Sequence, residues 1–153
     1  MLSKILFPTD FSEVADKAKA FILELHAADA LEVVVLNVIN QRLFDALDTH
    51  SAILFHDGRY KDDPDKIRQR IIDERRQRLD TLSEEFTKAG FTVKTVVAVG
   101  NPRKEILKVE DKEKISAIVM GSHGRSNLSE MLIGSVTEKV VRRSKANVIV
   151  IKR

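Results

Sequence analysis

The chain contains no cysteine among its 153 residues. A disulfide framework, a thiolate zinc site, an iron–sulfur cluster and a cysteine nucleophile are therefore excluded. No apolar run approaches the roughly 20 residues that a membrane-spanning helix needs. The apolar start, residues 2–7, is stopped by Pro8-Thr9-Asp10 and is too short for a signal-peptide core. We expect a cytoplasmic protein without a membrane segment.

Aromatic residues are also scarce, at 5%, with no tryptophan and one tyrosine. Stacking platforms for single-stranded nucleic acid therefore have few side chains to build on. Lysine and arginine number 26 against 23 aspartates and glutamates, so the formal charge of +3 is a small surplus on a densely charged surface. The composition argues against nucleic acid as a partner.

Hydrophobic residues make up 43% of the chain, which is enough for one core at this length. We predict a single domain over residues 1–153. Apolar, β-branched runs alternate with stretches of helical periodicity, which favours a mostly parallel sheet. The run Val33-Val34-Val35-Leu36 is apolar on both faces, as in a sheet covered by helices on both sides. The predicted strands are 2–7, 31–39, 91–99, 115–120 and 147–151, and the predicted helices begin at Ser12, Pro64, Pro102 and Ser135.

The stretch from Asn40 to Lys61 has the least readable pattern. Connections of this length are uncommon unless they are functional or locally folded. A short helix over Leu43, Phe44, Ala46 and Leu47 is the structure that its apolar residues favour. The charge-dense run Asp65 to Arg78 that follows has mixed signs, so we interpret it as a solvated helix face rather than a phosphate-binding surface.

Three segments fall at the ends of predicted strands, where open α/β sheets bind ligands: Pro8-Thr9-Asp10, Asn37-Val38 and Met120-Gly121. The last opens a loop with two glycines and leads to Gly134-Ser135-Val136-Thr137 at a predicted helix start. Free backbone N–H groups and the helix dipole favour an anion there. These features describe a phosphate cradle. Plain turns and an ordinary Ser135 cap explain the same residues equally well.

The spacing is Gly, two residues, Gly, nine residues, Gly-Ser, and it lacks the Walker ending. It closely resembles the ATP-binding motif of the universal stress protein family. The resemblance covers essentially the whole chain, from Phe7–Ser12 to Asn147–Ile151, and is most specific in Val119–Gly124 and Gly134–Thr137. It implies an α/β fold with a Rossmann-like, open five-stranded parallel sheet of order 3-2-1-4-5 and helices on both faces. It also implies a homodimer through the edge strand 147–151.

By position, the resemblance implies ATP as the ligand and assigns its contacts. These are Asp10 at the nucleoside with Pro8 and Thr9 shaping the pocket, Val38 at the adenine, Met120 and Gly121 along the nucleoside, and Gly124, Gly134, Ser135 and Val136 around the phosphates. Arg125 is a further candidate, because a guanidinium pairs well with phosphate, although a solvent-facing loop arginine is the competing interpretation. Asp10 alternatively caps the first helix.

Hydrolysis of ATP needs an oriented water and charge stabilisation at the phosphates. The sequence shows no acidic pair for Mg²⁺, no Walker-type lysine and no placed general base. We therefore predict a nucleotide-dependent regulatory homodimer of the stress response, read by an unidentified protein partner. Mg²⁺ accompanies the ATP phosphates in this prediction, without a dedicated metal site. A slow ATPase or phosphotransferase activated by a partner and a nucleotide-free dimeric scaffold remain the alternatives.

Overall fold

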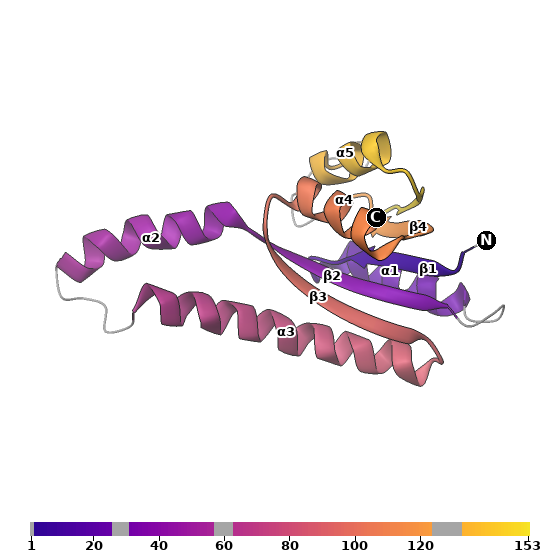
Figure 1. Ribbon diagram of the computed structural model, residues 1–153, viewed down its shortest axis with the longest axis horizontal. Helices are drawn as coiled ribbons and strands as arrows, with labels where there is room; N and C mark the ends of the chain where they lie inside the picture. Colours follow the sequence, from indigo (N-terminus) through magenta and orange to yellow (C-terminus); the bar gives the residue numbers. More distant parts are fainter. Residues whose placement is uncertain (1, 26–30, 57–62, 124–132) are drawn as a thin grey trace.

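The computed structural model describes residues 2–25, 31–56, 63–123 and 133–153, and the side chains of 50–56 lie outside this description. Strands and helices alternate along the chain except where two helices follow one another (Figure 1). The elements in chain order are β1 (Lys4–Pro8), α1 (Glu13–Glu24), β2 (Glu32–Asn40), α2 (Gln41–His56), α3 (Pro64–Lys88), β3 (Thr92–Gly100), α4 (Pro102–Glu113), β4 (Ala117–Gly121), α5 (Ser135–Arg143) and β5 (Asn147–Ile151).

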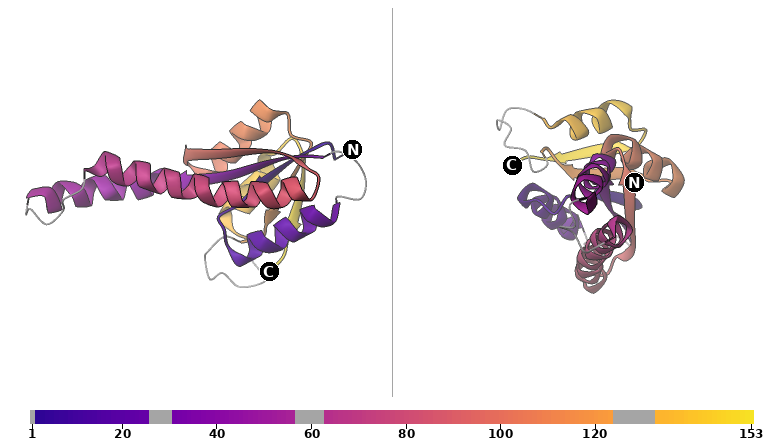
Figure 2. Two further views of the ribbon diagram at one scale, coloured as in Figure 1. Left: turned by 90° about the horizontal axis from the view of Figure 1, so that it is seen from below. Right: turned by 90° about the vertical axis from the view of Figure 1, so that its left-hand side faces the viewer.

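The five strands form one parallel sheet of order β3-β2-β1-β4-β5, which confirms the predicted fold class. Successive residues of each strand face opposite sides of the sheet. Ile5 and Phe7 of β1 belong to the core cluster beneath α1 and α3, whereas Leu6 between them belongs to the cluster beneath α4 and α5. Both faces are thus buried under helices (Figures 1 and 2), and the uniformly apolar strands are explained.

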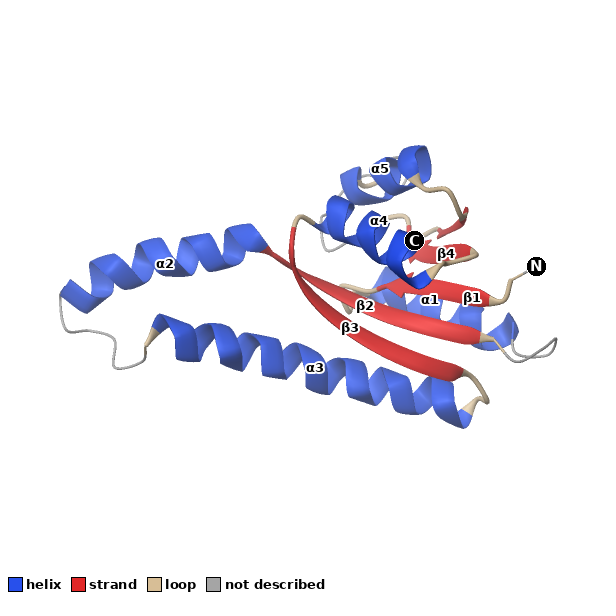
Figure 3. Cartoon of the chain, viewed as in Figure 1, coloured by secondary structure: helices blue, strands red, loops and turns tan. Residues whose placement is uncertain are grey.

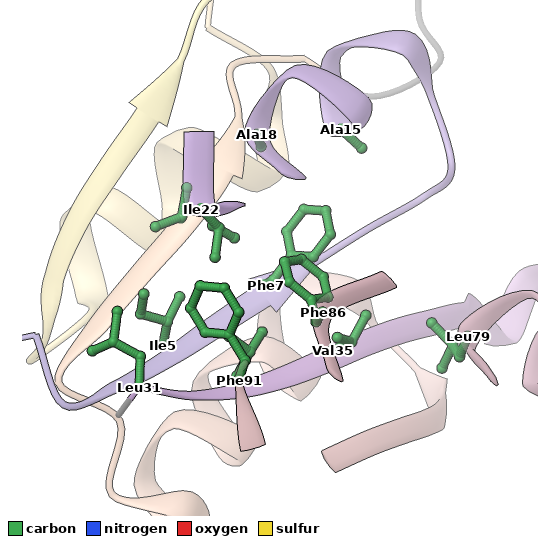
Figure 4. Packing of buried hydrophobic residues seen from close by; sticks show 12 residues of the cluster. Ile5, Phe7, Ala15, Ala18, Ile22, Leu31, Val35, Leu79, Phe86 and Phe91 are labelled. Carbon is green, nitrogen blue, oxygen red and sulfur yellow. The ribbon is translucent and has the colours of Figure 1, made fainter. Parts of the chain in front are cut away.

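Three phenylalanines organise the core on the α1 and α3 side (Figure 4). The ring of Phe86 on α3 lies edge-on to Phe7 of β1 at 6.0 Å between centroids and to Phe91 at 5.7 Å. Such edge-to-face pairs each contribute about 0.5–1.5 kcal/mol beyond their buried area. They fix the C-terminal half of α3 against the sheet.

The helices begin and end at local signals that the sequence displays. Ser12 caps α1 by accepting a hydrogen bond from the Ala15 N–H at 3.3 Å. Pro64 and Pro102 open α3 and α4 directly after a capping Asp63 and Asn101. Gly90, with φ of 96°, follows the end of α3, a conformation that glycine adopts at no steric cost.

The segment after β2 departs from the prediction in length. In place of a short helix within 40–61, α2 runs for 16 residues and begins directly where β2 ends (Figure 3). An ion pair between Asp48 and Arg68 joins α2 to α3. Contacts with a second helix sustain a helix whose own apolar pattern is interrupted by charged residues.

The helices α2 and α3 lie side by side and extend beyond the sheet as an arm (Figures 1 and 2). Strands β2 and β3 pair with each other along all nine residues of each strand. On its side of β2, β1 reaches only the first five of these residues, Glu32–Leu36. The last residues of β2, from Asn37 to Asn40, therefore pair with β3 alone. This two-stranded extension carries the arm away from the other three strands.

Candidate functional site

A cavity of about 580 Å³ lies at the carboxyl ends of β1, β2 and β4, beside the N-terminus of α5. Its volume falls within the roughly 300–1,000 Å³ of typical small-molecule sites. All but two of the residues singled out from the sequence line it: Pro8, Thr9, Asp10, Val38, Met120, Gly121, Gly134, Ser135 and Val136. Gly124 and Arg125 lie outside the described residues. The structure therefore brings together residues that are far apart in the sequence.

Six further residues line the same cavity and were not among the predicted contacts: Ala15, Leu36, Pro102, Ile106, His123 and Thr137. Pro102 and Ile106 stand one helical turn apart on α4, and this spacing is visible in the sequence. The sequence spacing does not tell which strand ends α4 lies beside, because that depends on the strand order of the sheet. Two of the six carried a local signal: Thr137 lies within the Gly134–Thr137 motif, and His123 lies within Val119–Gly124.

The segment from the last residue of β1 to the N-cap of α1, residues 8–12 and here named the 8–12 loop, presents Thr9 and Asp10 to the cavity. The Thr9 N–H donates to the Leu36 carbonyl at 2.8 Å, and the Thr9 hydroxyl accepts from the Phe11 N–H at 3.0 Å. One oxygen of Asp10 accepts from the Ser12 N–H at 3.0 Å, which forms an Asx turn. Since Ser12 itself is the N-cap of α1, the alternative that Asp10 caps this helix is wrong.

Asn37 supports this loop from β2. Its side chain is 1% exposed, and its amide N–H donates to the Thr9 carbonyl at 2.9 Å. The neighbouring Leu36 and Val38 point to the opposite face of the strand and line the cavity. One strand thus supplies both the apolar wall of the cavity and an anchor for the loop.

Gly121 ends β4, and its missing side chain is required by packing. A Cβ at this position would lie 2.6 Å from Cγ1 of Val14 on α1 and 3.3 Å from the His123 carbonyl oxygen. Real Cβ atoms essentially never approach another atom to 2.6 Å, so α1 depends on this glycine for its distance from β4. The close neighbour that requires glycine at this position is therefore a helix of the same chain.

Ser122 and His123 join β5 to the start of α5. The Ser122 N–H donates to the Ile151 carbonyl, and the Ser122 carbonyl accepts from the Gly134 N–H, each at 2.8 Å. Its hydroxyl lies 2.8 Å from Nδ1 of His123, and both side chains are buried. Nε2 of His123 has no hydrogen-bond partner among the described residues. These contacts show that Ser122 joins the end of β4 to β5 and to the start of α5.

The N-terminus of α5 lies at the cavity with N–H groups that have no acceptor within the helix. Its first internal hydrogen bond runs from the Glu138 N–H to the Gly134 carbonyl at 2.9 Å. The N–H groups of Ser135, Val136 and Thr137 therefore have no acceptor within the helix. The Thr137 hydroxyl donates to the Gly121 carbonyl at 2.9 Å and fixes the helix start against β4. Together with the helix dipole, these donors make a site for an anion.

The cavity thus combines an apolar wall with one anion-binding end. Asp10 is the single carboxylate among the described residues that line it. Within the described residues, no group of three or more His, Asp or Glu side chains is placed to hold a metal ion. The arrangement suits a ligand with a flat apolar part and a negatively charged part.

Comparison with known proteins identifies the family of the chain. The profile of the Universal stress protein family matches residues 1–152. The chain belongs to this family. Universal stress protein MJ0577 of Methanocaldococcus jannaschii is 37% identical over 100% of this chain and 96% of its own length. The solved structure of MJ0577 superimposes with a TM-score of 0.84 at 35% identity, covering 100% of this chain and 97% of that one.

A second relative, universal stress protein YxiE of Bacillus subtilis, is 28% identical over 99% of this chain and 100% of its own length. The matches therefore extend along the entire fold, including the arm. In the described residues, no helix is long and apolar enough to cross a membrane.

Proposed function

We propose that the cavity binds an adenine nucleotide, with ATP as the first candidate. The observation that carries this proposal is the row of N–H groups at the start of α5 that have no acceptor within the helix and lie beside a cavity with an apolar wall. In this proposal the phosphates lie at Gly134, Ser135 and Val136. Gly124 and Arg125 remain predicted phosphate contacts from the sequence alone.

The adenine in this proposal lies against Val38 and Met120, where the cavity wall is apolar. Asp10 and Thr9 face the ribose, because carboxylate and carbonyl oxygens accept hydrogen bonds from sugar hydroxyls. Pro8 and Gly121 complete this side of the cavity. These roles follow from the chemistry of each wall.

Other members of the family have been solved with adenine nucleotides. One universal stress protein structure is a complex with cAMP, and one from Archaeoglobus fulgidus is a complex with dAMP. Both are 20% identical to this chain, so the likeness itself carries only the fold. They support adenine nucleotides as the class of ligand to test first.

The decisive experiment places a charge at the anion end of the cavity. Ser135 is exposed at the first position of α5, so aspartate there fits the fold and interacts favourably with the helix dipole. The same carboxylate repels phosphate, and we expect Ser135→Asp to weaken ATP binding by about tenfold or more. Isothermal titration with ATP and with adenosine measures the effect, with Ser135→Asn as the neutral control of the same size.

Adenosine binding should be unchanged in Ser135→Asp, because adenosine carries no phosphate. The melting temperature without ligand should stay equal or rise slightly. The proposal fails if the unmodified protein binds no adenine nucleotide. Equal losses for ATP and adenosine would place the phosphates away from α5.

We further infer a homodimer through β5. This strand lies at the edge of the sheet and pairs only with β4 among the described strands, so its outer ladder groups need a partner or a cover. Light scattering of Ile149→Lys tests the inference, and a dimer that persists in this variant would contradict it. The same proposal includes three further parts. Mg²⁺ binds together with ATP, the protein acts in the stress response, and a protein partner distinguishes its nucleotide-bound from its nucleotide-free state.

A further inference from the structure

Two arginines of α3, Arg75 and Arg78, contact residues that hold or form the 8–12 loop. They stand three residues apart and so share one face of the helix. Arg75 reaches Asn37, and Arg78 reaches Phe11. Both lie within the charge-dense run from Asp65 to Arg78, for which the sequence predicts a helix face in contact with solvent. At these two positions the side chains also contact other parts of the protein.

The contact of Arg75 extends through Asn37 to the cavity. Nη1 of Arg75 lies 3.5 Å from the Asn37 side-chain oxygen, a long hydrogen bond to a buried acceptor. The amide nitrogen of the same side chain donates to the Thr9 carbonyl at 2.9 Å. Arg75 therefore helps to fix the orientation of the Asn37 amide, which in turn holds Thr9.

Arg78 holds the other end of the loop. Its guanidinium carbon lies 4.0 Å from the centre of the Phe11 ring, which is cation–π distance. Phe11 has φ of 62°, a left-handed backbone conformation that is unfavourable for residues other than glycine. Strained residues of this kind persist where their surroundings hold them, and they concentrate at functional sites.

We propose that Arg75 and Arg78 are positioning residues for the nucleotide site. Through Asn37 and Phe11 they hold the 8–12 loop in the conformation that presents Thr9 and Asp10 to the cavity. The proposal rests on the function proposed above and adds the residues that position its loop.

The test compares arginines of one helix. The variants are Arg75→Ala, Arg78→Ala and the double variant, with Arg78→Lys to restore the cation over the ring. Arg76→Ala is the matched control, because Arg76 is 62% exposed and its ion pair with Asp73 is long, at 3.9 Å. Titration with ATP and adenosine measures affinity, and amide hydrogen exchange of Phe11 and Ser12 without ligand measures the loop.

We expect Arg78→Ala to weaken binding roughly threefold and the double variant about tenfold. ATP and adenosine should lose affinity equally, because the loop faces the nucleoside, whereas Ser135→Asp affects ATP alone. Exchange at Phe11 and Ser12 should accelerate in the double variant. Arg78→Lys should recover most of the single loss, and Arg76→Ala should match the unmodified protein.

Unchanged affinity in the double variant, or equal losses in Arg76→Ala, would overturn the proposal. If the unmodified protein binds no nucleotide, the proposed function fails and the positioning proposal for the nucleotide site fails with it. Exchange at Phe11 and Ser12 separates this case from the first, because accelerated exchange still shows that α3 holds the loop. Normal exchange in a protein that binds nucleotide overturns the positioning role alone.

Discussion

Substitution of Gly121 by alanine should destabilise the protein through a clash with α1. The added Cβ would lie 2.6 Å from Val14 Cγ1 and 3.2 Å from Val14 Cβ. Val14 is 3% exposed, and a β-branched side chain in a helix has one strongly preferred rotamer, so it cannot turn away. Overpacking of this kind costs about 1–3 kcal/mol of unfolding free energy.

A second substitution shows whether Val14 causes this loss. Val14→Ala alone removes two buried methyl groups and should cost about 1.6 kcal/mol. It also removes the closest atom of the clash, so Gly121→Ala should cost much less when alanine is already present at position 14. Some cost should remain, because the Cβ of residue 14 and the His123 oxygen still lie 3.2 and 3.3 Å away. The expected coupling between the two substitutions is about 1 kcal/mol.

Urea unfolding of the four proteins, followed by circular dichroism, measures this cycle. For a chain of this size, Gly121→Ala alone should lower the melting temperature by about 2–12 °C. Equal losses in the presence and absence of Val14 would refute the reasoning. The glycine would then be required by the backbone or by the neighbouring carbonyl rather than by α1.

Other expected outcomes concern polar groups of α4. The buried Glu110 carboxylate accepts three hydrogen bonds from the turn between α5 and β5, so Glu110→Ala should cost about 3 kcal/mol in urea unfolding, and Glu110→Gln much less. Asn101→Ala removes the cap of α4 and should cost about 1 kcal/mol. A hydrogen bond from Lys94, assisted by Lys4 against partial burial, holds the pKa of Glu113 below its ordinary value. The ionised Glu113 carboxylate therefore adds its full share to the free energy of unfolding above the pKa that Glu113 has in the unfolded chain, and this share is lost as pH falls through its pKa in the folded protein. In urea unfolding, Glu113→Gln should be less stable than the unmodified protein near neutral pH, and the two free energies of unfolding should converge in acid.

The elements with local chemical signals were predictable from the sequence. Ser12, Pro64 and Pro102 mark helix starts because capping and proline geometry involve only neighbouring residues. The apolar run around Val35 identifies a strand buried on both faces. Together with the family resemblance, these signals led to the correct strand order.

Features that depend on distant neighbours were not predictable. The length of α2 depends on its contact with α3 rather than on its own apolar pattern. The special positions of Arg75 and Arg78 depend on which turn of α3 passes the 8–12 loop. The reason for Gly121 is a valine more than a hundred positions earlier. In each case the residue type is visible in the sequence, but its neighbour is known only from the fold.

Because β2 and β3 extend past the other strands, the arm and the cavity are built from different parts of the chain. None of the described residues that line the cavity lies between β2 and α4, although this interval contains the whole arm. Every 3.6 residues added to or removed from an outer helix changes the reach of the arm by about 5.4 Å. Provided that the turn of α3 with Arg75 and Arg78 is kept, such changes leave the cavity walls intact. Relatives with the same cavity are thus free to differ in the length of the arm without any change in the residues that line the cavity.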